Sequence, residues 1–383
     1  MLRQILTGLI GFSAVLSAIE CDYSSNLWLR AEYLLWEIQD APKVIPLVIE
    51  GAEVEEFSPL FGEPGTCVLL GNKKINHRWR SGGRFTLGYW FNANHCIGAE
   101  ANYFFLAKET SKKCVFSNGL LGSPFLAFPF IDTVTGLESS IALSRPSSFE
   151  GSASLKVSNQ MQGAEINAVS LFGCFNSWDI NLLGGFRYLN FTEKLNFNTS
   201  SPFIDPTVEN IYFTRDKFHM SNHFYGAQIG ANLDFNYCDL LVNVKAKLAV
   251  GAIHQSSKIK GELFLNDFTN FTFVQEFQGG YLALPSSIGH RKKTRCSIIP
   301  EINLNLGYKV TEAFAIQMGY NFFYVTNVLR ASKQVSREIN PTQSALFQYT
   351  PTPTLVNEAL PTGHLRSSNL WVQGFNLGLE FIY

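Results

Sequence analysis

Residues 240–250 read LLVNVKAKLAV, and this stretch decides the fold. Every even position from Leu240 to Val250 is apolar, whereas Asn243, Lys245 and Lys247 occupy odd positions. Successive side chains of a β-strand point to opposite faces, so a period of two predicts a strand with one apolar and one polar face. Its length is close to the 9–11 residues that a tilted strand needs to cross a bilayer.

The same alternation recurs along the chain. The other segments span residues 27–35, 85–91, 97–105, 164–168, 178–188, 225–233, 302–308, 314–324 and 375–383. Strands of a soluble sandwich also alternate, but they average about 5–6 residues. Pro300 lies within the segment that contains residues 302–308, and proline cannot donate to a ladder, so we expect it at the outer rim of that strand.

The connections between these segments alternate between short and long. Short turns are predicted near residues 93–94, 176–177, 236–238 and 309–311. The long connections cover about residues 39–80, 108–162, 191–222, 254–294 and 327–368. This is the pattern of an outer-membrane barrel with short periplasmic turns and long external loops. We therefore predict an all-β protein, a closed antiparallel transmembrane β-barrel of about ten strands. Strand extensions at 152–158 and 258–265 leave twelve strands as the alternative.

The N-terminus and the composition fit export to the bacterial outer membrane. Residues 1–18 have a positive start, an apolar run and small residues at Ser17-Ala18, which predicts a cleaved signal peptide followed by a single barrel domain, residues 19–383. A buried first helix is the alternative. Lys+Arg is 30 and Asp+Glu is 31, which argues against a nucleic-acid partner. Charged residues make up 16% and aromatic residues 14%, while mean hydropathy is only +0.04.

No motif indicates a cofactor, a metal or a catalytic set. The seven cysteines are widely spaced and form no CxxC, so neither a zinc site nor a redox motif is indicated. Exposed thiols in an oxidising compartment tend to form disulfides, so we expect at least one. An odd number leaves disulfide-linked or oligomeric neighbours open. We expect no enzyme, because a barrel hydrolase would need a grouped Ser/His or Asp/His set.

Several motifs in the second half occur in the order found in a known family. They are residues 182–189 (LLGGFRYL) with Glu193, residues 224–230 (FYGAQIG), residues 282–289 (LALPSSIG), residues 300–308 (PEINLNLGY), residues 319–322 (GYNF), residues 339–343 (INPTQ) and residues 375–381 (FNLGLEF). Together they resemble the Putative beta barrel porin-7 family over about residues 25–383. The resemblance implies an outer-membrane barrel of porin type, and it supplies no catalytic or binding residues.

With the apolar faces outward, charged residues face the lumen. The positive ones are Arg30, Arg84, Arg187, Lys245 and Lys247, and the negative ones are Glu32, Glu100, Glu165, Asp179, Glu301 and Glu380. These charges either line a water-filled channel or pair into a plug. Ten to twelve strands lie nearer to a filled barrel than to an open one. We expect a porin with a narrow or gated pore for small polar solutes. The alternative is a closed structural or adhesive barrel that acts through its long external loops.

The C-terminal strand carries a second expectation. Its alternate positions are apolar and its last residue is aromatic: Phe375, Leu377, Leu379, Phe381 and Tyr383. This pattern resembles the signal by which the outer-membrane assembly machinery recognises its substrates. That machinery and outer-membrane lipid are therefore the expected partners.

Overall fold

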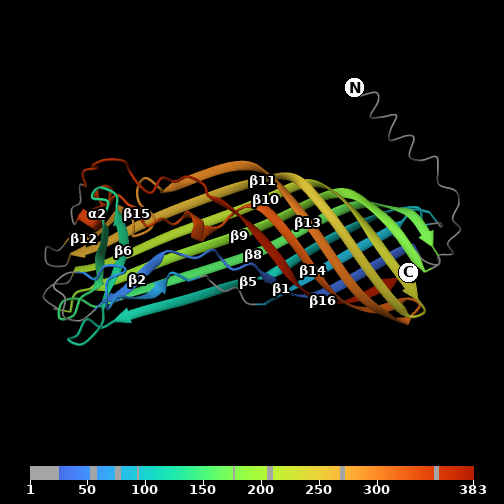
Figure 1. Ribbon diagram of the computed structural model, residues 1–383, viewed down its shortest axis with the longest axis horizontal. Helices are drawn as coiled ribbons and strands as arrows, with labels where there is room; N and C mark the ends of the chain where they lie inside the picture. Colours follow the sequence, from blue (N-terminus) through green and yellow to red (C-terminus); the bar gives the residue numbers. More distant parts are fainter. Residues whose placement is uncertain are drawn as a thin grey trace, which may run out of the picture.

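Ten antiparallel strands form the barrel of the computed structural model (Figure 1). The structure describes residues 26–51, 58–73, 79–92, 95–175, 177–204, 210–267, 272–348 and 353–383. The predicted signal peptide and the predicted turn at 93–94 lie outside these ranges. The barrel strands are β1 (Leu27–Ile38), β4 (Arg80–Trp90), β5 (Ile97–Ser117), β8 (Gly151–Phe175), β9 (Trp178–Pro202), β10 (Asn210–Tyr237), β11 (Leu240–Asp267), β13 (Gly289–Thr311), β14 (Phe314–Leu329) and β16 (Ser367–Ile382).

Every barrel strand has a partner on each side, so the sheet is closed. β1 pairs with both β4 and β16, which places Arg30 opposite Thr86 and Glu380. At the far side of the ring β10 pairs with β11 along its whole length. Closure matters because an unpaired edge is not tolerated in lipid. The segments 152–158 and 258–265 are the outer parts of β8 and β11, so the barrel has ten strands rather than twelve.

The longest strands extend well beyond the bilayer. β10 and β11 each have 28 residues. At roughly 3.4 Å per residue such a strand is about 95 Å long, or about 70 Å in height when tilted by 35–45°, whereas the apolar band of such barrels is about 25 Å tall. On β10 the exposed apolar side chains run from Tyr225 to Tyr237, and on β11 from Leu240 to Val250. More than half of the barrel height therefore projects on the external side.

The long external connections fold into a second, five-stranded sheet. It contains β2 (Pro46–Gly51), β3 (Cys67–Gly71), β6 (Phe125–Asp132), β7 (Glu138–Ser144) and β15 (Glu338–Ile339). The sheet lies at the end of the barrel opposite the C-terminus (Figure 1). Leu126 and Phe128 of β6 share one buried cluster with Phe197 of β9 and Phe218 of β10. We call this sheet, together with the helical turns of residues 331–348, the extracellular head, and it packs into the outer end of the barrel.

The remaining elements are short. They are β12 (Thr272–Gln278), which pairs with the outer end of β11, the 3-10 helices Ala331–Gln334 and Pro341–Gln343, and α2 (Ala345–Gln348). No helix among the described residues is long and apolar enough to cross a bilayer.

A buried carboxylate anchors the segment that follows β12. Asp216 of β10 accepts hydrogen bonds from the backbone N–H groups of Tyr281 at 3.0 Å, Leu282 at 3.2 Å and Ala283 at 3.0 Å. Burial raises the pKa of Asp216 to about 7, and the three N–H donors oppose that rise. This contact fastens the segment with the LALPSSIG motif to the wall of the barrel.

Pro300 does not lie at the rim that the sequence predicted. β13 continues to Gly289, so Pro300 is an interior strand residue opposite Leu248 of β11. On its other side the pairing with β14 ends one residue away, at Glu301 and Phe323. The missing N–H of proline therefore falls where a ladder stops, which explains why the strand tolerates it.

Candidate functional site: the barrel interior

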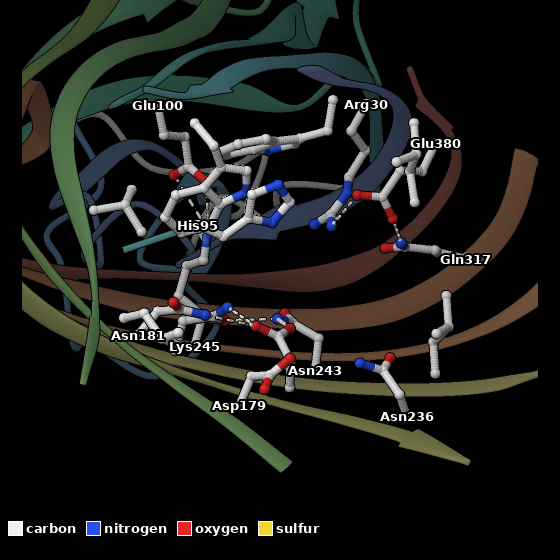
Figure 2. A pocket seen from close by; sticks show the side chains of 18 of the residues that line it. Arg30, His95, Glu100, Asp179, Asn181, Asn236, Asn243, Lys245, Gln317 and Glu380 are labelled. Atoms are coloured by element: carbon white, nitrogen blue, oxygen red, sulfur yellow. Dashed lines mark hydrogen bonds and ion pairs between the residues drawn. The ribbon is translucent and has the colours of Figure 1, made fainter. Parts of the chain in front are cut away.

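The periplasmic end of the lumen holds a cavity of about 270 Å³. Figure 2 shows that its walls carry charged and amide side chains from several strands. The Arg30 guanidinium lies 2.9 Å from Glu380, and the Lys245 ammonium lies 2.9 Å from Glu100. Asp179 also lines this cavity. We call it the vestibule. It ends inward at a layer of paired charges.

This layer is centred on Arg187 of β9, which is 1% exposed. Arg187 Nη1 lies 2.5 Å from Glu301 of β13 and 3.6 Å from Glu165 of β8. Lys247 of β11 contacts the same two carboxylates, at 3.2 Å from Glu301 and 2.7 Å from Glu165. Two cations and two carboxylates thus join four strands across the lumen, and each charge has an opposite charge beside it.

A second pair extends this layer to the first strands. Arg84 of β4 binds Glu32 of β1 through two nitrogens, at 2.5 and 2.7 Å, the bidentate geometry that favours arginine. Asn376 donates to Glu32 at 2.6 Å and to Asn305 at 3.0 Å. Asn305 in turn donates to Asn243 at 2.9 Å. Arg84 also donates to Asn303 at 3.3 Å, and Asn303 donates to Glu301 at 2.8 Å, so this asparagine links the Arg84 pair to the Arg187 cluster.

The structure places all eleven sequence-predicted lumen residues inside the barrel. Each of the five cations forms an ion pair with one or two of five glutamates. Asp179 lies nearer the periplasmic rim, in the wall of the vestibule. We call the buried ion pairs of Arg84, Arg187 and Lys247, with their glutamates and bridging asparagines, the charge network.

Beyond the charge network the lumen is filled by apolar side chains, which the sequence analysis missed. Trp36 lies 5.4 Å from Phe104 and 5.9 Å from Phe323, measured between ring centroids. Trp36 also packs on the backbone of Gly374, where an added Cβ would lie 2.5 Å from the indole. The full set, which we call the apolar plug, is Leu34, Trp36, Ile38, Phe104, Leu106, Met161, Leu189, Phe191, Phe224, Ala249, Ile253, Ile299, Phe323, Val325, Val328, Leu370 and Val372.

The charge network rests directly on the apolar plug. The guanidinium of Arg187 lies 5.4 Å from the centroid of Phe323, and that of Arg84 lies 5.6 Å from Trp36. Such cation–π contacts gain strength where water is excluded. A signal for the plug exists in the sequence, since Trp36 alternates on the same face as Arg30 and Glu32. A bulky apolar residue on a face assigned to water indicates a filled lumen.

A further buried ion pair lies on the external side of the plug. Arg330, which follows β14, binds Glu193 of β9 at 2.7 Å, and both side chains are almost fully buried. Glu193 also accepts from the backbone N–H of Ala331 at 2.7 Å. The family motif contains Glu193, but nothing in the sequence pairs it with Arg330, which comes from a distant loop. This contact fixes the loop after β14 across the barrel.

The cysteines and the metal-ligating residue types form no site in the described residues. Cys174 is disulfide-bonded, whereas Cys67, Cys114, Cys238 and Cys296 are free. Within the described ranges, no three His, Cys, Asp or Glu side chains gather as a metal ion would require.

The solved structures that resemble this chain are only distantly similar to it in sequence. No curated protein matches the sequence. Among solved structures, the outer membrane protease OmpT from Escherichia coli is 9% identical, with 94% of this chain and 97% of that chain covered and a TM-score of 0.42. A Pseudomonas aeruginosa FadL homologue is 8% identical over 94% of this chain and 90% of that chain, with a TM-score of 0.23. The P. putida toluene transporter TodX is 8% identical over 94% and 91%, also at 0.23. Likenesses at this level say nothing about the activity of this chain.

The family comparison covers almost all of the described chain. The sequence model of the family described as Putative beta barrel porin-7 (BBP7) matches residues 28–383. This confirms the resemblance seen in the motifs and places the protein in the outer membrane. The chain belongs to the Putative beta barrel porin-7 family.

Proposed function

We propose that this outer-membrane barrel is closed at rest and acts through its extracellular head, without catalytic activity. This is the alternative that the sequence left beside a narrow or gated pore. The observation that carries the proposal is the apolar plug, a cluster of buried side chains that lies between the charge network and the head. A path for a polar solute would have to cross a layer that contains Trp36, Phe104 and Phe323.

The charge network supports the same proposal. Its ion pairs join strands up to three places apart in the ring, so water and solutes would have to displace them to pass. Groups that line an open channel stay hydrated, whereas Arg187, Glu165 and Glu301 are at most 7% exposed. Because a buried charge without a partner is costly, the paired state is the favoured one.

Recordings in planar bilayers test whether the barrel is closed. We expect the refolded full chain to give no steady conductance and no swelling of liposomes in sugars of graded size. A variant that carries Trp36→Ala and Phe323→Ala should leak, because it removes two rings from the plug. Tyr33→Ala is the matched control, since Tyr33 lies on the same strand but faces lipid and is 51% exposed. Steady conductance of the unmodified protein, altered by Arg187→Lys, would refute the closed barrel.

Adherence of expressing cells tests the role of the head. Residues 133–137 connect β6 to β7 at the external end, so a glycine-serine linker of equal length changes the surface without removing a strand. We expect this variant to lower adherence to protein-coated surfaces and to other expressing cells, whereas Arg187→Lys should leave both unchanged. Equal adherence of cells with the linker variant, cells with the unmodified protein and cells without the protein would argue against a role of the head in adherence.

A gated pore is the second candidate, and the vestibule favours it. The vestibule of about 270 Å³ already reaches from the periplasmic rim to the charge network, so only part of the barrel height would need to open. Discrete openings that appear only at high voltage, and that Trp36→Ala makes frequent, would support gating. The absence of conductance at every voltage would argue against gating and support the closed barrel.

A further inference from the structure

Basic residues gather on the outer face of the barrel, on its external half. On the barrel strands, side chains flanked by buried neighbours point outward, and His219, between buried Phe218 and Met220, is an example. We call the following outward residues of β8 to β11 and β13 the cationic band: Lys156, Lys194, Lys217, His219, Lys258, Lys260, His290 and Lys292.

The register brings these residues side by side in rows. His219 of β10 lies opposite Lys194 of β9 on one side and Lys258 of β11 on the other. Lys258 in turn lies opposite His290 of β13. One row of four basic side chains therefore crosses four neighbouring strands. In the next row outward, Lys217 lies opposite Lys260.

Apart from Lys217, the lysines of the cationic band have no acidic partner among the described residues. Among the described residues, no ion pair involves Lys156, Lys194, Lys258, Lys260 or Lys292. The acid nearest to the band on these strands is Glu262, which lies 3.6 Å from Arg215 and 3.5 Å from Lys217. Glu276 follows on β12, further from the membrane.

Like charges directly opposite each other destabilise a sheet. Partial burial lowers the pKa of His219, and the neighbouring Lys194 and Lys258 lower it further. An anion on the row would relieve that repulsion.

The depth of the cationic band indicates what that partner is. The lipid-facing belt ends at Tyr188 and Tyr225, whose rings lie 5.1 Å apart. Lys194 and His219 are each six positions further out, about 20 Å along a strand and about 14 Å in height at the usual tilt. A phospholipid headgroup layer adds only about 5–8 Å to each side of the hydrocarbon core. The row lies beyond that layer, at the level of the sugars of a larger glycolipid.

We propose that the cationic band binds the phosphorylated sugar headgroup of a glycolipid in the outer leaflet. Phosphates fit the rows because lysine ammonium groups and imidazole N–H groups donate to phosphate oxygens without a rigid geometry. The acyl chains of the same lipid would lie on the apolar belt below, along β9 to β11. This proposal does not depend on whether the lumen is open or closed.

Binding of lipopolysaccharide with a phosphorylated inner core, measured on the full chain in nanodiscs, tests the proposal. The variant Lys194→Gln, Lys258→Gln and Lys260→Gln should bind it at least tenfold more weakly. The matched control is Lys43→Gln, Lys73→Gln and Lys108→Gln, three exposed lysines outside the cationic band, and it should bind as the unmodified protein does. Equal binding by the band variant and the control would overturn the proposal.

Two measurements on the unmodified protein keep the test decisive if the band variant fails to fold. Lipopolysaccharide stripped of its phosphates should bind at least tenfold more weakly, and raising NaCl from 0.1 to 0.5 M should weaken binding of the intact lipid, since salt screens exposed charges. Equal affinity for the stripped lipid would refute recognition of phosphate. Full competition by 10 mM inorganic phosphate would show a site for free anions instead of a lipid site.

Discussion

Arg187 is the residue on which the charge network depends most. Its guanidinium serves Glu301 and Glu165, and it also packs on Phe323. We predict that Arg187→Ala lowers the free energy of unfolding by about 3–5 kcal/mol, because it leaves a buried carboxylate without its partner. Urea unfolding of the liposome-embedded protein, followed by tryptophan fluorescence, measures this.

The control for this prediction is Arg215→Ala. Arg215 also forms an ion pair, at 3.6 Å from Glu262, but its side chain is 39% exposed. Exposed pairs contribute about 0.2–1 kcal/mol, so the control should lose less than about 1 kcal/mol. Equal losses for the two variants would mean that Arg187 is hydrated in solution, as in an open channel.

The next prediction concerns Asp216, which lies on the part of β10 that projects beyond the membrane. Asp216→Ala would leave the buried N–H groups of residues 281–283 without acceptors, at about 1–3 kcal/mol for each group. We expect the segment around residues 279–288 to become sensitive to protease while the ten barrel strands stay intact. Asp239→Ala, at an exposed periplasmic turn, should leave the cleavage pattern unchanged. Mass spectrometry of the limited digest reads out the site of cutting.

The sequence located the charged lumen residues but not their partners. Alternation places Arg187 and Glu301 on inward faces, because the period of two depends only on neighbours along one strand. Whether they meet depends on the stagger of strands that lie three places apart in the ring, which no local pattern contains. The pairing of Arg330 with Glu193 is harder still, because one partner comes from a loop.

At the scale of elements, β16 closes the barrel by pairing with β1. Phe381 lies opposite Leu29 of β1 and Phe314 of β14, so the end of β16 belongs to the closing seam. We propose that the same residues are read by the assembly machinery. Deleting Phe381–Tyr383 should abolish surface protein and leave aggregated or degraded chain in the periplasm, as immunoblots of fractionated cells would show.

A single substitution distinguishes recognition by the assembly machinery from the role of β16 in closing the barrel. Tyr383 is 89% exposed and lies after the last residue of β16, so Tyr383→Ala removes the terminal aromatic ring with little loss of packing. A lower surface level with unchanged stability of the refolded protein would indicate recognition of the terminal aromatic. Normal surface levels of the truncated chain would contradict both roles.

The strand count and the position of Pro300 show where element boundaries could not be read. The apolar belt ends near the middle of β8, β11 and β13, and from there the outer faces become polar while the inner faces become apolar. An alternation that changes its sense in this way resembles the end of one strand and the start of another. Hydrogen bonding continues across the change, so the true strands are longer than the membrane requires.

For the whole molecule, the free cysteines report orientation. Cys114 lies near the external end of β5, and Cys238 lies at the turn between β10 and β11, both exposed. We predict that a membrane-impermeant maleimide labels Cys114 on intact cells and labels Cys238 only after the outer membrane is opened. Variants with Cys114→Ser or Cys238→Ser identify each signal. Labelling of Cys238 on intact cells would mean that the barrel has the opposite orientation in the membrane.

The layered interior also determines how the ten strands are staggered. Sliding β1 by two residues against its neighbours would leave its lipid face unchanged, since Leu29, Tyr33 and Leu35 are all apolar. The same slip would bring Leu34 opposite Arg84 in place of Glu32, and would move the indole of Trp36 away from the gap over Gly374. In a lumen filled with water along its whole length, the correct and the shifted register would make similar inward contacts. In this barrel the order of charged residues, aromatic rings and glycines along each inner face differs from one height to the next. The inward contacts, and not the contacts with lipid, therefore favour one register between neighbouring strands.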